Sequence, residues 1–165
     1  MQIVISPWAR TMRNGKANPK NYPYWKAVVE KLKKQDIHII QIGRAGEKII
    51  EGVGEMITDS PLEELERLID KSDTWIAVDN FLQHLITSKP GVVIWALSDP
   101  LIFGYPQNTN ILISRGWLKP RQFDIWEVEE FNPKAFPKPD QVVEEVMKLI
   151  KEEGCRTKIK DTTGI

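Results

Sequence analysis

Residues 74–84, TWIAVDNFLQH, contain the pattern that decides the fold. An apolar run over residues 75–78 ends at Asp79, and leucines at helical spacing follow it. This pattern is typical of a buried strand that leads directly into a helix, here expected over residues 80–88. In an open α/β sheet, ligands bind outside the carboxyl ends of the strands, so we expect Asp79 and His84 at the rim of a crevice.

Both polar residues also have a purely structural interpretation. Asp79 stands where an N-cap residue would accept a hydrogen bond from the backbone N–H of residue 81 or 82. A single histidine on a largely apolar helix, such as His84, is more often packed and hydrogen-bonded than part of a site. The stretch alone leaves both interpretations open.

Strand and helix patterns alternate along the rest of the chain, which predicts a doubly wound, mainly parallel sheet in a three-layer α/β/α domain. Ser60, Pro61 and Glu63 have the form of a capping box at a helix start. We expect one domain over residues 1–153 and a frayed polar tail over residues 154–165. The other expected strands span residues 2–5, 37–42, 92–95 and 110–114, and the other helices residues 23–34, 60–69 and 140–153.

Composition excludes several classes of protein. The 165 residues include 23 basic and 23 acidic side chains, so no overall field favours nucleic acid as a partner. The one cysteine, Cys155, has no second thiol with which to form a disulfide or a zinc cluster, and two histidines make a metal cage improbable. Without a signal peptide or a transmembrane segment, we expect a cytoplasmic protein with no metal or other cofactor.

A basic loop follows the first strand. Residues 8–21 carry Arg10, Arg13, Lys16 and Lys20 among turn-forming residues and contain no acid. Guanidinium and ammonium groups gathered at the carboxyl end of a strand are suited to a phosphate. The alternative is a solvated basic loop that binds nothing.

Two other loops follow predicted strands. In residues 43–47, GRAGE, Gly43 allows close backbone approach, and Glu47 could accept hydrogen bonds from a ribose diol or favour the start of a helix. Ser98 and Asp99 lie in the loop after the strand at residues 92–95, near the same edge. The sequence therefore predicts polar groups from several strand ends at one site.

In order and spacing, these segments resemble the C-terminal, donor-binding half of a GT-B glycosyltransferase, most closely the ADP-heptose heptosyltransferases of glycosyltransferase family 9. The K-x-W-P motif of that family resembles KNYP at residues 20–23, and its D-T-G-x-x-H-L motif resembles DNFLQHL at residues 79–85. Its S-L-x-E-L-x-x-L-I-x-x-A-D and K-P-V-V-x-L-F-G-x-T-D-P segments resemble residues 60–73 and 89–100, and its strand and glycine turn resemble residues 39–47.

The resemblance implies a Rossmann-like, nucleotide-sugar-binding domain equivalent to one half of the GT-B fold. Lys20 would pair with the donor diphosphate, Glu47 would bind the nucleoside, and Asp79 would line the donor site, with His84 supporting the following helix. Asn80 and Phe81 stand where the family has threonine and glycine, and Asn80 can still donate a hydrogen bond to the diphosphate. The phenylalanine must turn its ring away for a diphosphate to approach the backbone.

The family's acceptor-binding half, which supplies the catalytic base, has no counterpart in this sequence. We therefore expect transfer to need a separate acceptor-binding subunit, a longer chain or a homo-oligomer. One alternative is a module that binds a nucleotide or phosphorylated ligand without turnover, and another is a degenerate subunit whose crevice is closed by Phe81 and Trp95. A nucleoside deoxyribosyltransferase-like enzyme is a weaker alternative, because its nucleophilic glutamate has no convincing counterpart.

Overall fold

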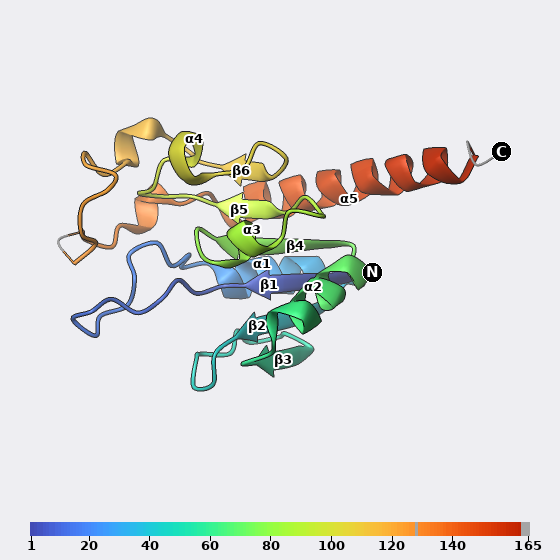
Figure 1. Cartoon of the computed structure of the whole chain (residues 1–165), viewed down its shortest axis with the longest axis horizontal. Helices are drawn as coiled ribbons and strands as arrows, with labels where there is room; N and C mark the ends of the chain where they lie inside the picture. The colour runs from blue at the N-terminus through green and yellow to red at the C-terminus, as the bar shows by residue number, and fades with distance from the viewer. Residues whose placement is uncertain (128, 163–165) are drawn as a thin grey trace.

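The six strands form one parallel sheet in the order β3-β2-β1-β4-β5-β6 (Figure 1). This computed structural model describes residues 1–127 and 129–162, with side chains up to residue 154. The order is that of a doubly wound Rossmann-like sheet. The strands are β1 (Gln2–Ser6), β2 (His38–Gly43), β3 (Glu55–Thr58), β4 (Thr74–Val78), β5 (Val92–Ile94) and β6 (Thr109–Ile111).

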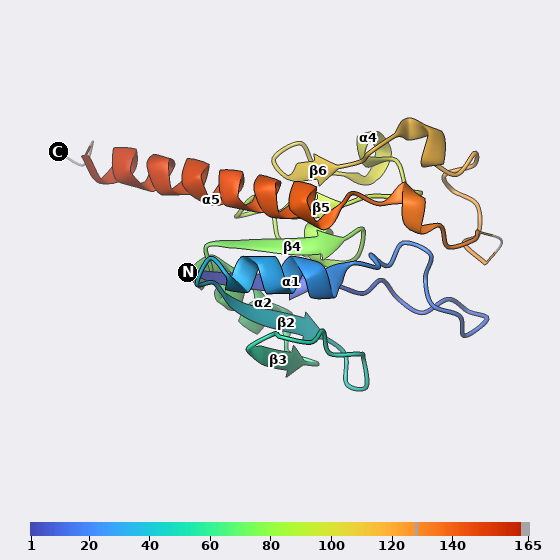
Figure 2. The ribbon, with the colours of Figure 1, turned by 180° about the vertical axis from the view of Figure 1, so that it is seen from behind.

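Helices cover both faces of the sheet. Figures 1 and 2 show α2 (Leu62–Lys71) and α3 (Leu82–Leu85) on one face, and α1 (Trp25–Lys33) and α5 (Pro139–Thr162) on the other. A short helix, α4 (Pro100–Phe103), follows β5. Two 3-10 turns, at Arg115–Trp117 and Pro133–Ala135, interrupt the long connection to α5. The predicted three-layer α/β/α architecture is confirmed.

Alternate residues of each strand face opposite layers, as the pleat of a strand requires. In β1, Ile3 and Ile5 pack in the core under α1 and α5, whereas Val4 packs in the core under α2. Both faces are apolar, so the strand reads as an unbroken apolar run. That is why the central strands could be recognised from the sequence.

The strand predictions hold with ends that differ by at most three residues, except for β3, which the sequence did not predict. β3 has only four residues, lies at the sheet edge and is half-buried, so its apolar signal is weak. It pairs in parallel with β2, and no helix lies between the two strands.

Two helix predictions need correction. The helix expected over residues 80–88 is the four-residue α3, because Ile86 already has an extended backbone. The capping box at Ser60 is wrong: Pro61 is the N-cap residue of α2, and no side chain caps the helix. Helix α5 runs on to Thr162, through most of the predicted tail, whose last residues, 163–165, lie outside the described part of the chain.

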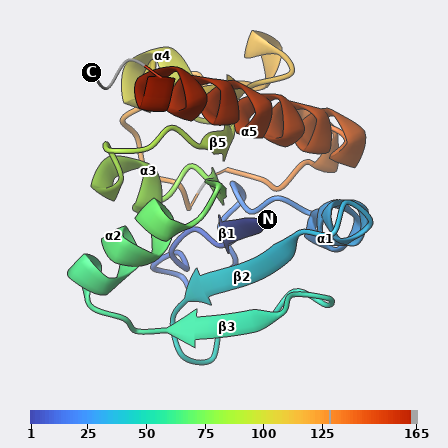
Figure 3. The same cartoon turned by 90° about the vertical axis from the view of Figure 1, so that its right-hand side faces the viewer.

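The arrangement creates a crevice between β1 and β4. The chain leaves β1 toward α1 on one face, and leaves β4 toward α3 on the opposite face, as the view along the sheet shows (Figure 3). The two connections diverge, which opens a space at the carboxyl ends of these neighbouring strands.

Candidate functional site

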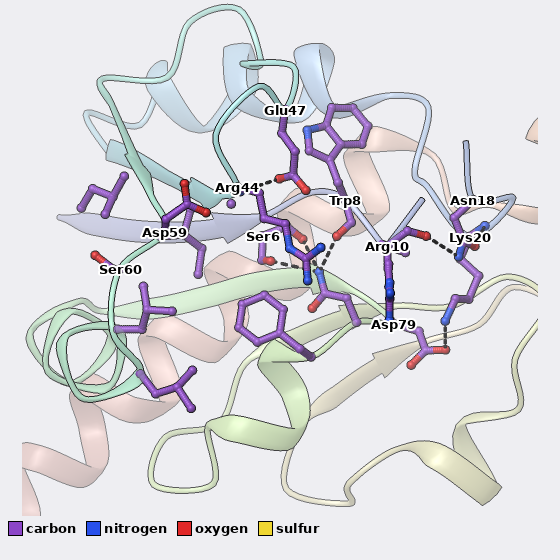
Figure 4. A pocket seen from close by; sticks show the side chains of 18 residues that line it. Ser6, Trp8, Arg10, Asn18, Lys20, Arg44, Glu47, Asp59, Ser60 and Asp79 are labelled. Carbon is purple, nitrogen blue, oxygen red and sulfur yellow. Dashed lines mark hydrogen bonds and ion pairs between the residues drawn. The ribbon is translucent and has the colours of Figure 1, made fainter. Parts of the chain in front are cut away.

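A cavity of about 450 Å³ lies at the carboxyl ends of β1, β2, β3 and β4. This volume is in the range of small-molecule sites in proteins. The close view shows side chains from all four strand ends converging on it (Figure 4). The predicted site residues that line it are Arg10, Lys20, Gly43, Glu47, Asp79 and Asn80.

The lining changes character along the cavity because it follows the strand order. Asp59, which follows β3, lies at one side of the cavity, and Lys20 lies at the other (Figure 4). Glu47, in the turn after β2, lies between them. Ile57 of β3 and Leu65 of α2 belong to the Asp59 side. The side next to β3 thus combines apolar side chains with the polar Asp59 and Ser60, Arg44 and Glu47 lie in the middle, and Arg10 and Lys20 lie toward β1 and β4.

Lys20 and Asp79 form the ion pair at the cationic side. Lys20 Nζ lies 3.0 Å from Asp79 Oδ2, which also accepts a hydrogen bond from the Ser98 hydroxyl at 2.6 Å. Asp79 Oδ1 accepts from Gln83 Nε2 at 2.7 Å. Both oxygens of the buried carboxylate are thus satisfied by the protein, and Asp79 does not act as the N-cap of α3.

Asn80 joins β4 to the loop after β1. Its Nδ2 donates to Ser6 O at 3.1 Å, to Ser6 Oγ at 2.9 Å and to Trp8 O at 3.1 Å, and its Oδ1 accepts from Leu82 N at 3.0 Å. Asn80 therefore makes the local capping bond that was considered for Asp79. A phosphate could take an Asn80 donor only in exchange for one of these bonds.

The turn after β2 is held by two carboxylates. Glu47 Oε2 accepts from Arg44 N at 3.0 Å, and Asp59 Oδ2 accepts from Ala45 N at 3.1 Å. A Cβ atom at Gly43 would lie 2.2 Å from Glu47 Oε2, so glycine leaves the space that the folded-back carboxylate fills. No helix begins at Glu47, so that structural interpretation is wrong.

Four of the predicted residues lie outside the cavity lining. The Arg13 backbone N–H donates to Glu127 Oε1, and His84 Nδ1 lies 3.3 Å from the Tyr105 hydroxyl. Ser98 does not line the cavity but donates a hydrogen bond from its hydroxyl to Asp79, which does. Asp99 is the N-cap residue of α4 and does not line the cavity.

Asp99 forms an ion pair with Arg115. The Arg115 guanidinium donates from Nη1 to Oδ1 at 3.0 Å and from Nη2 to Oδ2 at 2.6 Å. These hydrogen bonds lower the pKa of the Asp99 carboxyl, against the opposing effect of burial. The pair fixes the loop after β5 and takes no part in the cavity.

Several residues that line the cavity were not predicted to do so: Trp8, Asn18, Arg44, Asp59 and Ser60. Asp59 and Ser60 follow β3, the strand that the sequence did not reveal. The ring of Phe81 is half-exposed and forms part of the wall, whereas Trp95 is fully buried and donates its indole N–H to Asn110. Trp95 therefore does not close the crevice.

No protein-family model matches the chain, and no curated protein sequence matches it. Two solved structures of TibC have the same fold, with TM-scores of 0.66 and 0.68 and sequence identities of 19% and 20%. One is described as a dodecameric iron-containing heptosyltransferase in complex with ADP-D-beta-D-heptose. The other is described as a bacterial iron-containing dodecameric glycosyltransferase from enterotoxigenic E. coli H10407.

Both TibC structures are described as iron-containing. Among the described residues, no group of three or more histidine, cysteine, aspartate and glutamate side chains is placed to hold a metal ion. The same part of the chain contains no helix with the length and apolar character needed to cross a membrane.

The match covers 92% of this chain but 45% of each TibC chain. The chain thus spans less than half the length of these solved structures. At this level of identity the likeness concerns the fold and not the reaction. It establishes that the chain has the Rossmann-like α/β fold found in heptosyltransferase structures.

Proposed function

We propose that the cavity binds the nucleoside diphosphate portion of a nucleotide-sugar donor, and that the chain is the donor-binding part of a glycosyltransferase. The observation that carries this proposal is that Lys20 and Arg10 lie at one side of the cavity and the apolar Ile57 and Leu65 at the other, with Glu47 between them. The parts of a nucleoside diphosphate follow the same order, from an anionic diphosphate through a polar ribose to a planar base.

Each part of such a ligand finds suitable groups. Lys20 and Arg10 would neutralise the diphosphate, since charge-assisted hydrogen bonds are the strongest that a phosphate receives. Glu47 would accept from the ribose hydroxyls, and the base would pack toward Ile57 and Leu65. The ADP-heptose complex of TibC supports this class of ligand.

In a transfer reaction, the acceptor oxygen forms a bond to the anomeric carbon of the sugar as the bond from that carbon to the diphosphate breaks, and negative charge grows on the leaving diphosphate. A fixed cation such as Lys20 would stabilise that charge. The acceptor hydroxyl must also lose a proton to a base. Each carboxylate that lines the cavity already accepts a hydrogen bond from the chain, and both oxygens of Asp79 are taken.

The occupied oxygens of Asp79 make it a poor base, and we propose that the acceptor and the base come from outside the described residues. An acceptor-binding subunit, a further part of a longer chain or a second copy of this chain could supply them. A binding module without turnover is the second candidate, and it is favoured by the saturated state of Asp79.

Isothermal titration calorimetry with ADP-, UDP-, GDP- and CDP-sugars tests the proposal. We expect saturable binding of at least one donor, and weaker binding by Lys20→Ala. The matched control is Lys26→Ala, which removes an exposed lysine paired with Glu51 outside the cavity. No binding of any donor at millimolar concentration would refute the proposed ligand class.

The two candidate functions differ in turnover. A donor that binds can be incubated with the protein in a lysate that supplies acceptors and partner proteins, and free nucleoside diphosphate can be measured against the Lys20→Ala control. Release of diphosphate that depends on Lys20 supports a transferase. Binding without release supports the module.

A further inference from the structure

Trp126 contacts the cation of the cavity from a distant part of the sequence. Lys20 Nζ lies over the Trp126 ring, 4.9 Å from its centroid, and Lys119 Nζ lies 4.2 Å from the same ring. Trp126 is half-buried and packs against the core beneath α1 and α5. The indole therefore joins the Lys20 ammonium to a fixed part of the fold.

The segment that carries Trp126 is attached at several points. Lys119 N donates to Leu97 O at 2.9 Å, and Gln122 Nε2 donates to the same carbonyl at 3.0 Å. At its other end, Glu127 Oε1 accepts from Arg13 N at 3.2 Å in the basic loop. Trp126 is thus held relative to both β5 and the loop that carries Lys20.

Lys119 supports the indole from within the protein. Its side chain is buried, and its ammonium donates to the Asp124 carbonyl. Burial lowers the pKa of Lys119, and the nearby Lys20 charge adds to this effect, whereas Glu129 and Asp124 oppose it. Lys119 does not line the cavity, which leaves Lys20 as the ammonium that a ligand can reach at this side.

We propose that Trp126 is a positioning residue for Lys20, holding its ammonium at the cationic side of the cavity through the face of the indole. This inference rests on the proposed function, because it concerns the affinity for a diphosphate. An incoming phosphate competes with Asp79 for Lys20, and the released ammonium would be free to turn toward solvent. The indole face limits that freedom without neutralising the charge, so the ammonium stays available to the phosphate.

The contact requires an aromatic face and not merely bulk. Trp126→Phe keeps a ring for the ammonium, whereas Trp126→Leu keeps an apolar side chain without one. From the usual strength of a cation–π contact, we expect Trp126→Leu to weaken binding of a nucleoside diphosphate roughly three- to tenfold. Trp126→Phe should weaken it less than about twofold, since phenylalanine still offers a π face.

The experiment is calorimetric titration of the full chain with ADP, UDP, GDP and CDP, and with the four matching nucleosides, which lack phosphate. Phe131→Leu is the matched control, because Phe131 belongs to the same connection but contacts the Phe136 ring. Trp126→Met provides a second variant without a ring, and thermal melting establishes that each variant is folded.

The predicted result is a loss in Trp126→Leu and Trp126→Met that affects diphosphates, spares nucleosides and is restored by Trp126→Phe. Wild-type affinity in the folded Leu and Met variants would overturn the inference, and so would an equal loss in the Phe variant. Wild-type protein that binds none of the nucleoside diphosphates would instead refute the proposed function itself, and this inference with it.

Discussion

Lys20 Nζ lies 3.0 Å from Asp79 Oδ2, and this contact joins the loop after β1 to the end of β4. The two side chains retain 16% and 10% of their exposure, so water and salt screen the pair weakly. Ser98 and Gln83 also donate to Asp79. These two donors remain bonded to the carboxylate when a phosphate draws the ammonium away. The contact with Asp79 itself places the Lys20 ammonium at this side of the cavity before any ligand arrives.

Removal of this cation should weaken donor binding selectively. Lys20→Ala is expected to reduce the affinity for a nucleoside diphosphate roughly ten- to hundredfold, the usual effect of losing a hydrogen bond to a charged group. Calorimetry measures this loss, with Lys26→Ala as the control. Equal affinities of the two variants would show that Lys20 does not bind the diphosphate.

Ser98 should matter for stability although it does not line the cavity. Ser98→Ala removes a buried donor from the Asp79 carboxylate, and we expect a loss of about 1–3 kcal/mol in the free energy of unfolding. Urea denaturation measures it. Ser88→Ala, at an exposed hydroxyl that donates to Asp70, should change stability by less than about 0.5 kcal/mol. A neutral Ser98→Ala would mean that Asp79 does not depend on this bond.

The two glycines of the turn after β2 should respond differently to alanine. At Gly43 a Cβ atom displaces the Glu47 carboxylate, which can swing away, so Gly43→Ala should weaken binding several-fold while changing stability little. Gly46 has a φ of 84° and open space around it. Gly46→Ala should cost roughly 1–2 kcal/mol of stability through backbone strain.

Calorimetry and urea denaturation of both variants separate these effects. The reverse pattern, with binding lost in Gly46→Ala and retained in Gly43→Ala, would contradict the assignment of Glu47 to the ligand site.

The Asp99–Arg115 pair predicts a specific loss of stability in acid. The pKa of Asp99 is lower in the folded protein because of Arg115, so the ionised carboxyl stabilises the fold. This contribution is fully present above the unfolded pKa of about 3.9 and is lost as the pH falls through the lower folded value.

Asp99→Asn retains a capping side chain for α4 and removes the charge. At pH 7 it should be less stable than wild type by on the order of 1 kcal/mol, since Arg115 is partly exposed. Unfolding measured between pH 7 and pH 2 should show this difference shrinking in acid. A difference that stays constant with pH would exclude the ion pair as its source.

Much of the fold was predictable because strands buried on both faces are marked by continuous apolar residues. The run at residues 75–78 gave β4, and polar residues after each strand placed Lys20, Glu47 and Asp79 near one cavity. Parallel strands bring their carboxyl ends to one edge, so positions after successive strands become neighbours without any further information.

Other features depend on contacts that sequence spacing does not reveal. β3 is short and half-buried, so its pattern and the adjacent Asp59 were missed. Asn80, and not Asp79, accepts the local capping bond from Leu82 N. Asp79 is instead occupied by Lys20, Ser98 and Gln83, which lie on other elements or one turn further along the chain. The approach of Trp126 to Lys20 required the folded connection after β6.

The most direct test of the central claim is a crystal structure of the protein with the nucleoside diphosphate that it binds most tightly. The account predicts diphosphate oxygens within hydrogen-bonding distance of Lys20 Nζ, the ribose hydroxyls at Glu47 and the base toward Ile57. A nucleotide bound elsewhere on the chain, or with its base at Lys20 and its phosphates toward β3, would contradict it.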